Sequence, residues 1–308
     1  MITIRNNPSY YSNCVLDGTN TIIDFVRFFG METPFSFATD EMREQKLSEH
    51  AELRKTNRMI YCNFIEPPYP ACLTTEHYEF LVKYADEYDL ILTNDERLLK
   101  VIDHAEIFPF GSSRLLSDKY QGLITSINDD YEYNTQKTEA INFLYNYRKS
   151  HYLPGHEIRK QIAQSSYSTK MPFNVYIGTK DNHCVPICSE NMIYKDTNKL
   201  RCHESMFSVV VENMKNDFYF SVKIVDSFLC KSVPIYYGAR KINHFFDVES
   251  ILQFENMEEL SNILHNLTTN DYFRVQKSLI ENYNRAKNYS RNISERVVER
   301  IQESVSKQ

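Results

Sequence analysis

One lysine stands near the start of a segment that is otherwise composed for burial. The segment is FYFSVKIVDSFLCKSVPIYYG, residues 218–238, and its pattern predicts a helix from about Ser221 to Cys230 and a strand at 233–237. If Ser221 caps the helix, Lys223 lies in the first helical turn. The unpaired N–H groups of such a turn already favour anions, so an added lysine suits a phosphate or pyrophosphate. The alternative is a lysine that reaches from a helix end into water.

A glutamate and an arginine elsewhere in the chain could serve the same chemistry. Glu66 follows an expected buried strand at 58–65, and two prolines stiffen the turn behind it. Functional groups of α/β folds lie beyond the carboxyl ends of strands, where a fixed carboxylate can act as a general base. Arg159, in the amphipathic segment 154–162, could bind a phosphate through two N–H groups. The alternatives are an ordinary loop carboxylate and a solvated arginine on a helix face.

A zinc site is the weaker interpretation of the His and Cys residues in the middle of the chain. Their spacing does not match the paired CxxC pattern of structural zinc sites, so buried thiols are favoured. The chain also lacks the Asp-x-Asp motif with which many nucleotide-sugar enzymes hold a divalent ion against pyrophosphate. If the chain handles a pyrophosphate, Lys223 and Arg159 would have to hold it instead. The residues considered for zinc are His183, Cys184, Cys188, Cys202 and His203.

Composition and charge argue against several classes of protein. With 308 residues, of which 42% are hydrophobic, the chain is long enough for two ordinary cores. A net charge of -6 without a run of Lys or Arg disfavours nucleic acid as the main partner. Only seven glycines are present, and neither a P-loop nor a GxGxxG motif occurs, which argues against P-loop ATPases and NAD-dependent dehydrogenases.

Cysteine usage and hydropathy predict a cytoplasmic protein. The seven cysteines are scattered and odd in number, which is not the pattern of a disulfide framework. We find no signal-peptide pattern, and no apolar run approaches the roughly 18 residues needed to span a bilayer. We therefore expect a chain without a transmembrane segment in a reducing compartment.

Short apolar runs alternate with helical patterns along the chain, which predicts parallel α/β layers. We place a first domain at 1–115, a second at 116–275, and a helical tail that packs back on the body at 276–308. The expected strands are at 58–65, 89–93, 105–109, 120–127, 173–177, 206–211, 233–237 and 250–254. The expected helices are at 76–88, 95–102, 136–149, 155–164 and 221–230, with a long helical pattern at 270–306.

The run 207-FSVVVENMKNDFYFSVKIVDSFLCKSVPIYYGA-239 resembles the signature of the family-10 glycosyltransferases, the α-1,3/4-fucosyltransferases. That pattern is F-x-x-x-x-E-N, a spacer, Y-[VF]-[TS]-E-K-[LI] and, after about ten helical residues, V-P-[IV]-x-x-G. Upstream, 155-GHEIRKQI-162 is similar to the family's G-H-x-x-R helix, and 64-FIEPP-68 to the strand end that carries its proposed catalytic glutamate. The matched positions of the signature are Glu212, Asn213, Tyr219, Phe220, Ser221, Lys223, Ile224, Val233, Pro234 and Gly238.

This resemblance implies a GT-B architecture, in which two Rossmann-like domains face each other across a cleft. It implies inverting, metal-independent transfer of a sugar from a nucleotide-diphospho-sugar to a glycan hydroxyl. The N-terminal domain would hold the acceptor, with Glu66 as the base, and the C-terminal domain would hold the donor. Lys223 and Arg159 would bind the diphosphate. The donor-site residues that the resemblance carries over are Arg159, Asn213, Tyr219, Ser221, Val222 and Lys223.

The chain departs from the family pattern directly before the lysine. The family's glutamate is Val222 here, and valine cannot accept a hydrogen bond from a sugar hydroxyl, so the donor could be fucose or another sugar. A second departure is the long segment 129–153, which could reshape the acceptor side. The alternatives to a glycan glycosyltransferase are a sugar- or nucleotide-binding module without activity and a glycosyltransferase of modified DNA. The acidic balance disfavours the latter.

Overall fold

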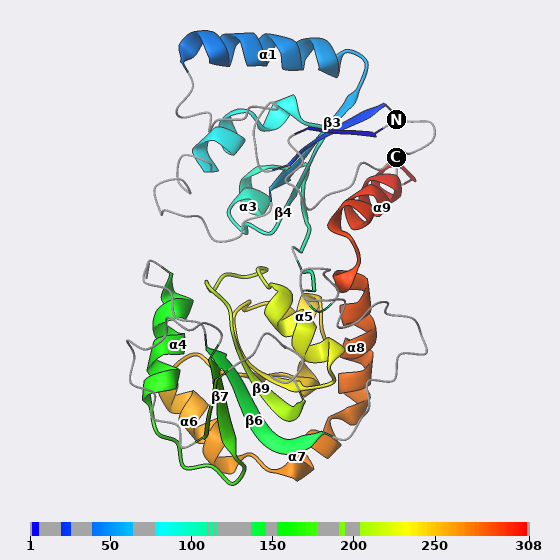
Figure 1. Ribbon diagram of the computed structural model, residues 1–308. Helices are drawn as coiled ribbons and strands as arrows, with labels where there is room; N and C mark the ends of the chain where they lie inside the picture. Colours follow the sequence, from blue (N-terminus) through cyan, green and yellow to red (C-terminus); the bar gives the residue numbers. More distant parts are fainter. Residues whose placement is uncertain are drawn as a thin grey trace. The chain divides into compact units, whose positions relative to one another are not determined.

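The computed structural model of the chain describes residues 2–5, 20–25, 39–63, 78–109, 111–113, 115, 137–145, 153–177, 191–194 and 204–306. Within them, two parallel sheets with flanking helices belong to two compact units (Figure 1). The first unit comprises Met1–Phe110, Asp217–Tyr219 and Asn292–Gln308, and the second comprises Gly111–Asn216 and Phe220–Arg291. The predicted α/β fold class with two parallel layers is confirmed.

The strands of the first sheet lie in the order β1-β2-β3-β4-β5, which is also their order along the chain. Right-handed crossovers between such neighbours carry their helices to one face of the sheet. That face packs against apolar side chains from α1 and the helical segment 78–83. The described elements are β1 (Ile2–Arg5), β2 (Thr21–Phe25), α1 (Asp40–Arg54), β3 (Arg58–Asn63), a 3-10 turn (Ala85–Glu87), β4 (Leu90–Thr93), α3 (Leu98–Val101) and β5 (Ala105–Ile107).

Helix α9 (Ile293–Ser306), from the end of the chain, covers the opposite face of the first sheet. Successive residues of β3 alternate between the two cores, as the pleat of a strand requires. The α9 side chains of Val297 and Ile301 are 0% and 2% exposed in the core on this face. Arg300 adds an ion pair with Glu106 at 2.6 Å. A segment remote in sequence therefore completes the first unit.

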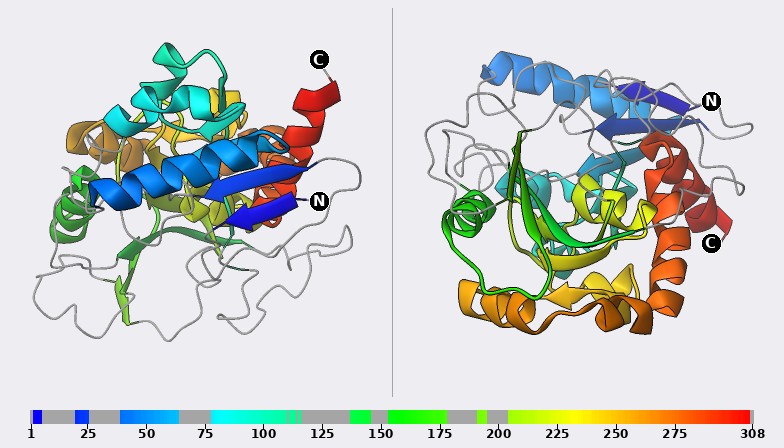
Figure 2. Two further views of the ribbon diagram at one scale, coloured as in Figure 1. Left: turned by 90° about the horizontal axis from the view of Figure 1, so that it is seen from above. Right: turned by 60° about the horizontal axis from the view of Figure 1, so that its bottom comes forward.

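The six parallel strands of the second sheet lie in the order β11-β10-β9-β6-β7-β8. Numbered from β6 and taken from the β8 edge, this is the order 3-2-1-4-5-6 of Rossmann-type nucleotide-binding sheets. Helices α4, α6, α7 and α8 lie around this sheet (Figure 2). The strands are β6 (Thr138–Tyr145), β7 (Phe173–Ile177), β8 (Asn191–Tyr194), β9 (Ser205–Val211), β10 (Val233–Tyr237) and β11 (Leu252–Gln253). The helices are α4 (Pro154–Gln164), α5 (Val222–Leu229), α6 (Met257–Asn266), α7 (Thr269–Arg274) and α8 (Gln276–Ser290), with 3-10 turns at Ile242–His244 and Val248–Ser250.

The predicted helix at 136–149 is wrong, because Thr138–Tyr145 forms β6. This strand lies between two parallel neighbours, and its residues 140–143 are buried without interruption. A strand covered on both faces carries a continuous apolar run instead of alternating residues. Periodicity alone does not distinguish such a short run from a buried helical segment.

The other strands and helices expected within the described residues are confirmed, with shifted ends. The strand expected at 250–254 shortens to β11, and the helix expected at 95–102 shortens to α3. The strand expected at 120–127 lies outside the described residues. The helical pattern of the tail corresponds to α7, α8 and α9, of which only α9 clusters with the first unit. The first segment of the first unit ends at Phe110, and the predicted boundary is at residue 115.

The described part of the chain contains no helix that is both long and apolar enough to cross a membrane. Two cysteines in this part, Cys62 and Cys230, are buried. Burial, reinforced by the nearby charge of Asp24, raises the pKa of the Cys62 thiol well above its ordinary value. This thiol is therefore a protonated core residue and not a nucleophile.

The role of α9 can be tested by truncating Val297. Val297→Ala removes two methyl groups from a fully buried position, and we expect the free energy of unfolding to fall by about 2 kcal/mol. Glu303→Ala on the same helix removes only an exposed ion pair with Arg300 and should change it by less than about 0.5 kcal/mol. Urea unfolding followed by circular dichroism measures both. Equal midpoints for Val297→Ala and wild type would show that α9 does not stabilise the first unit.

Candidate functional site

The second sheet reverses its direction of growth between β6 and β9. From β6 the chain adds β7 and β8 on one side, and from β9 it adds β10 and β11 on the other. In open α/β sheets, ligands bind beyond the carboxyl ends of the strands at such a reversal. Helix α4 follows β6 and helix α5 follows β9. The polar groups on the early turns of these two helices are therefore placed where a ligand is expected.

Helix α5 begins as the sequence predicts. Ser221 has extended backbone angles, φ -127° and ψ -171°, and its hydroxyl accepts a hydrogen bond from the Lys223 backbone N–H at 3.4 Å. Ser221 is thus the N-cap, and Lys223 lies in the first turn. The helix continues because its apolar side chains are buried against the sheet and α8, including Ile224 and Phe228 at 0% exposure. This burial holds the first turn, with its cation, at the sheet edge.

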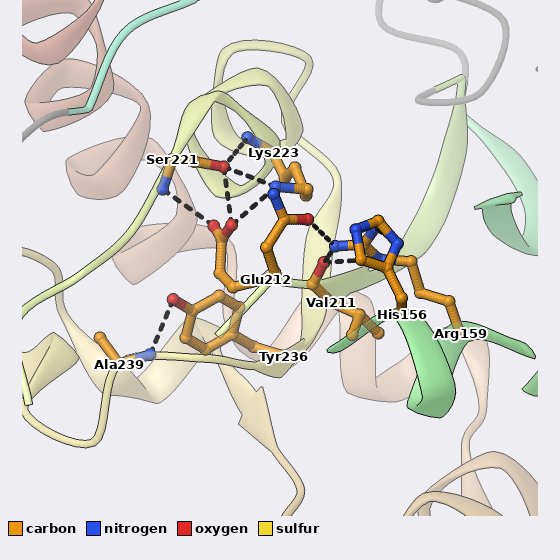
Figure 3. A network of polar contacts seen from close by, with 9 residues as sticks. His156, Arg159, Val211, Glu212, Ser221, Lys223, Tyr236 and Ala239 are labelled. Carbon is orange, nitrogen blue, oxygen red and sulfur yellow. Dashed lines mark hydrogen bonds and ion pairs between the residues drawn. The ribbon is translucent and has the colours of Figure 1, made fainter. Parts of the chain in front are cut away.

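A buried carboxylate organises this first turn. Glu212 directly follows β9 and is 0% exposed (Figure 3). Its Oε1 accepts from the backbone N–H of Ser221 at 2.9 Å, and its Oε2 accepts from the Ser221 hydroxyl at 2.7 Å. The same Oε2 accepts from the ammonium of Lys223 at 2.8 Å, and that ammonium also donates to the Ser221 hydroxyl at 2.9 Å. One carboxylate thereby fixes both the helix cap and the lysine.

The ion pair between Glu212 and Lys223 is asymmetric in its burial. The glutamate side chain is 0% exposed and the lysine side chain is 31% exposed. A buried carboxylate is costly unless it is paired and hydrogen-bonded, and here it is both. The lysine, in contrast, retains a face toward solvent. Lys223 can therefore meet an incoming anion while it remains paired with Glu212.

Arg159 on α4 is nearly buried and is held by the end of β9. At 7% exposure, it donates through Nε and Nη2 to the Val211 carbonyl at 3.1 and 2.9 Å. Its Nη2 also donates to Oδ1 of Asn213, and its Nη1 lies 3.2 Å from Nδ1 of His156. The interpretation of Arg159 as a solvated helix-face arginine is wrong. Its guanidinium is instead fixed by Val211 and Asn213, the two neighbours in sequence of Glu212, which holds Lys223.

A glycine allows α4 to approach this strand end. The backbone N–H of Gly155 donates to the carbonyl of Asn213 at 3.0 Å. A Cβ added at Gly155 would lie 1.8 Å from the carbonyl oxygen of Glu212, so a side chain cannot be accommodated without moving the backbone. Close approach of α4 therefore requires glycine at this position.

Four of the predicted donor-site residues contribute to one network, in which Glu212 and Asn213 are neighbours along the chain (Figure 3). Val222 is half-buried between the cap and Lys223. Tyr219 is 1% exposed and clusters with the first unit. Glu66 lies outside the described residues, as do the residues considered for zinc. The four predicted donor-site residues in this network are Arg159, Asn213, Ser221 and Lys223.

Sequence reasoning did not foresee the roles of Glu212 and His156. Glu212 was matched to the family pattern, but no function was assigned to it. Its position directly after a mostly apolar strand is an available signal, because such a residue lies at the sheet edge. His156 precedes Arg159 by three residues on a helix, which places both side chains on one face.

The loop after β9 carries a further cation. Lys215 is 16% exposed, pairs with Glu255, and lies 5.3 Å from the ring centroid of Tyr237 at the end of β10. Burial lowers the pKa of Lys215, and the nearby Arg240 acts in the same direction, whereas Glu259 opposes both.

Among the described residues, no group of three His, Cys, Asp or Glu side chains could hold a metal ion.

No protein-family model and no curated protein matches the sequence. Solved structures match over most of the chain. An α1,3-fucosyltransferase is 14% identical, with 92% of this chain and 96% of that chain covered and a TM-score of 0.46. A trehalose-6-phosphate synthase studied for glycosyltransfer with retention is 11% identical, with 94% and 74% covered and a TM-score of 0.51. A UDP-forming α,α-trehalose-phosphate synthase from Burkholderia xenovorans is 11% identical, with 88% and 71% covered and a TM-score of 0.51.

At these identities, the two matches with trehalose-phosphate synthases show the fold alone. That fold is the GT-B type with its two parallel α/β sheets, as the sequence predicts. Membership of family 10, the donor sugar and the residue roles remain predictions.

The dependence of Glu212 on Lys223 can be tested through stability. Lys223→Met leaves the buried carboxylate without its cation, and we expect the free energy of unfolding to fall by about 2 kcal/mol. Adding Glu212→Gln removes the buried charge, so the double variant should recover about 1 kcal/mol or more of that loss. Lys277→Met, at an exposed lysine of α8, is the control and should stay within about 0.5 kcal/mol of wild type. Strict additivity of the two site substitutions in urea unfolding would contradict the pairing.

Proposed function

We propose that the chain is a glycosyltransferase that moves a sugar from a nucleotide-diphospho-sugar to a hydroxyl of a glycan acceptor. The observation that carries this proposal is the pair of fixed cations, Lys223 and Arg159, at the point where the second sheet reverses. A Rossmann-type strand order at the same place suits a nucleotide. The fold is also that of a trehalose-6-phosphate synthase studied for glycosyltransfer, which supports the same class of reaction.

The cations match the needs of the leaving group. When the bond between the anomeric carbon and the diphosphate breaks, negative charge grows on the diphosphate, and fixed positive charge lowers that barrier. Lys223 and Arg159 carry two positive charges and Glu212 one negative charge, which leaves one net positive charge in the network. Glu212 and Asn213 hold both cations before a donor arrives, so little reorganisation is needed during the reaction.

On the acceptor side, we propose Glu66 as the base that removes the proton of the attacking hydroxyl. Its position after β3 and before two prolines supports this role, although its side chain lies outside the described residues. Direct attack by the acceptor inverts the anomeric carbon. Lys223 and Arg159 take the part that a divalent ion plays in other nucleotide-sugar enzymes, so we propose a metal-independent reaction. Asn213 and Tyr219 would line the donor site.

For the transferred sugar, we propose fucose from GDP-fucose or a related sugar. The resemblance of 207–239 to the family-10 signature supports this choice. Val222, half-buried beside Lys223, replaces the family's glutamate and cannot bind a sugar hydroxyl. A sugar that needs no hydrogen bond at this position is therefore the expected donor.

The proposal is tested by turnover of a panel of GDP-, UDP- and dTDP-sugars in the presence of EDTA. With the sugar that is turned over, Lys223→Ala should lower kcat/KM by an amount equivalent to about 2–4 kcal/mol of transition-state stabilisation. The double variant Glu212→Gln/Lys223→Ala should show the same loss, because it lacks the cation even though it carries no unpaired buried charge. Lys277→Ala is the control and should keep the wild-type kcat/KM.

Four outcomes would count against the proposal or one of its parts. Nucleotide binding without turnover of any donor would indicate a binding module of the same fold. Loss of turnover in EDTA with recovery in manganese would contradict the metal-free mechanism. Unchanged kcat/KM in Lys223→Ala would remove that residue from the site. Retardation of DNA at low salt, with sugar transfer to it, would replace the glycan by modified DNA as the acceptor.

A further inference from the structure

An aromatic cluster lies immediately before the first turn of α5. Its centre is Phe220, which is 0% exposed and precedes the N-cap Ser221. The Phe220 ring lies edge-on to Tyr289 of α8, with ring centroids 5.1 Å apart, and contacts Phe246 at 5.3 Å. Helix α8 itself packs along α5. The backbone of the helix cap is therefore attached to a ring that is held from several sides.

Phe220 and two of its neighbours, Gly111 and Tyr289, lie at or near points where the chain passes between its two units. The chain enters the second unit at Gly111, re-enters it at Phe220 and leaves it after Arg291, two residues beyond Tyr289. A Cβ added at Gly111 would lie 2.3 Å from Cε2 of Phe220, so the glycine fits directly against the ring. Three of the four passages thus lie, within the second unit, at or near the residue that precedes the cap, and the fourth is the exit after Asn216.

The segment that begins at Gly111 is also attached to α5 itself. The hydroxyl of Ser113 donates to Oδ1 of the buried Asp226 at 2.7 Å and accepts from the backbone N–H of Leu115 at 3.1 Å. Asp226 follows Lys223 by three residues, which places both on one side of the helix. The connecting segment therefore contacts α5 at two points. Gly111 contacts Phe220 just before the cap, and Ser113 binds Asp226 in the second turn.

We propose that Phe220 is a positioning residue of the donor site and that its ring couples the connecting segments to the cation Lys223. This inference rests on the proposed function, because it assigns the ring a role in binding the donor diphosphate. Movement of the ring moves the Ser221 backbone, whose N–H and hydroxyl both bind Glu212. Glu212 in turn holds the Lys223 ammonium. A small displacement at Phe220 thus reaches the group that meets the diphosphate, where about 1 Å of misplacement has large effects.

Size-matched substitutions test this coupling. Gly111→Ala forces the Phe220 ring to move, and Phe220→Leu makes room for the added methyl group. By calorimetry with inorganic pyrophosphate as the probe, we expect Gly111→Ala to weaken binding by about tenfold. Phe220→Leu alone should weaken binding in the same direction. The double variant should bind pyrophosphate more tightly than Gly111→Ala, because the smaller side chain accommodates the methyl group.

A second readout does not depend on a ligand. Hydrogen exchange of the backbone amides of 221–225 should accelerate in Gly111→Ala and slow again in the double variant. Phe228→Leu is the matched control, because Phe228 is equally buried on α5 and contacts Phe246 at 4.8 Å but lies two turns from the cap. Phe228→Leu should destabilise the protein like Phe220→Leu and leave pyrophosphate binding unchanged.

The outcomes separate this inference from the proposed function. If wild type binds neither pyrophosphate nor GDP, UDP or dTDP, the proposed function fails. The exchange data would then still report whether the contact between Gly111 and Phe220 holds the start of α5 in place. The positioning role of Phe220 is overturned if Gly111→Ala leaves exchange at 221–225 and pyrophosphate affinity as in wild type. It is equally overturned if Phe228→Leu weakens binding as much as Phe220→Leu. If Gly111→Ala does not fold, the comparison of Phe220→Leu with Phe228→Leu decides.

Discussion

The buried pairing of Glu212 with Lys223 is the interaction on which the candidate site depends. A carboxylate without solvent exposure remains charged only if cations and N–H groups surround it, and here the ammonium, the cap hydroxyl and the cap N–H do so. The same carboxylate therefore places the helix start and the cation together. Asn213, the next residue, does the equivalent for Arg159. Two adjacent residues thus hold both cations at one strand end.

The two sheets differ in a way that bears on where a ligand binds. The described strands of the first sheet follow chain order, so their helices gather on one face and α9 covers the other. The second sheet reverses between β6 and β9, and a reversal opens the strand ends to a ligand. The cations lie at that reversal. Topology and side-chain chemistry therefore point independently to the same edge of the same sheet.

Much of the second unit could be predicted from sequence because its signals are local. The cap at Ser221, the apolar face of α5 and the buried strand β9 all follow from neighbouring residues. The failures concern tertiary contacts. The sequence predicts a helix where β6 lies, because a strand buried on both faces lacks the alternation of apolar and polar residues that marks a half-buried strand. The burial of Arg159 against the Val211 carbonyl joins residues 52 positions apart, and no local pattern contains it. The family resemblance implies a role for Lys223 and includes Glu212, but it assigns no function to this carboxylate, which holds the lysine.

We propose that a nucleoside diphosphate binds at the reversal between β6 and β9 through Lys223 and Arg159. A crystal structure of the protein with bound GDP or UDP is the most direct test. We expect diphosphate oxygens within hydrogen-bonding distance, about 2.7–3.2 Å, of the Lys223 ammonium, with Glu212 still paired to the same nitrogen. A nucleotide bound without contact to either cation, or bound elsewhere than at the carboxyl ends of β6 and β9, would contradict it.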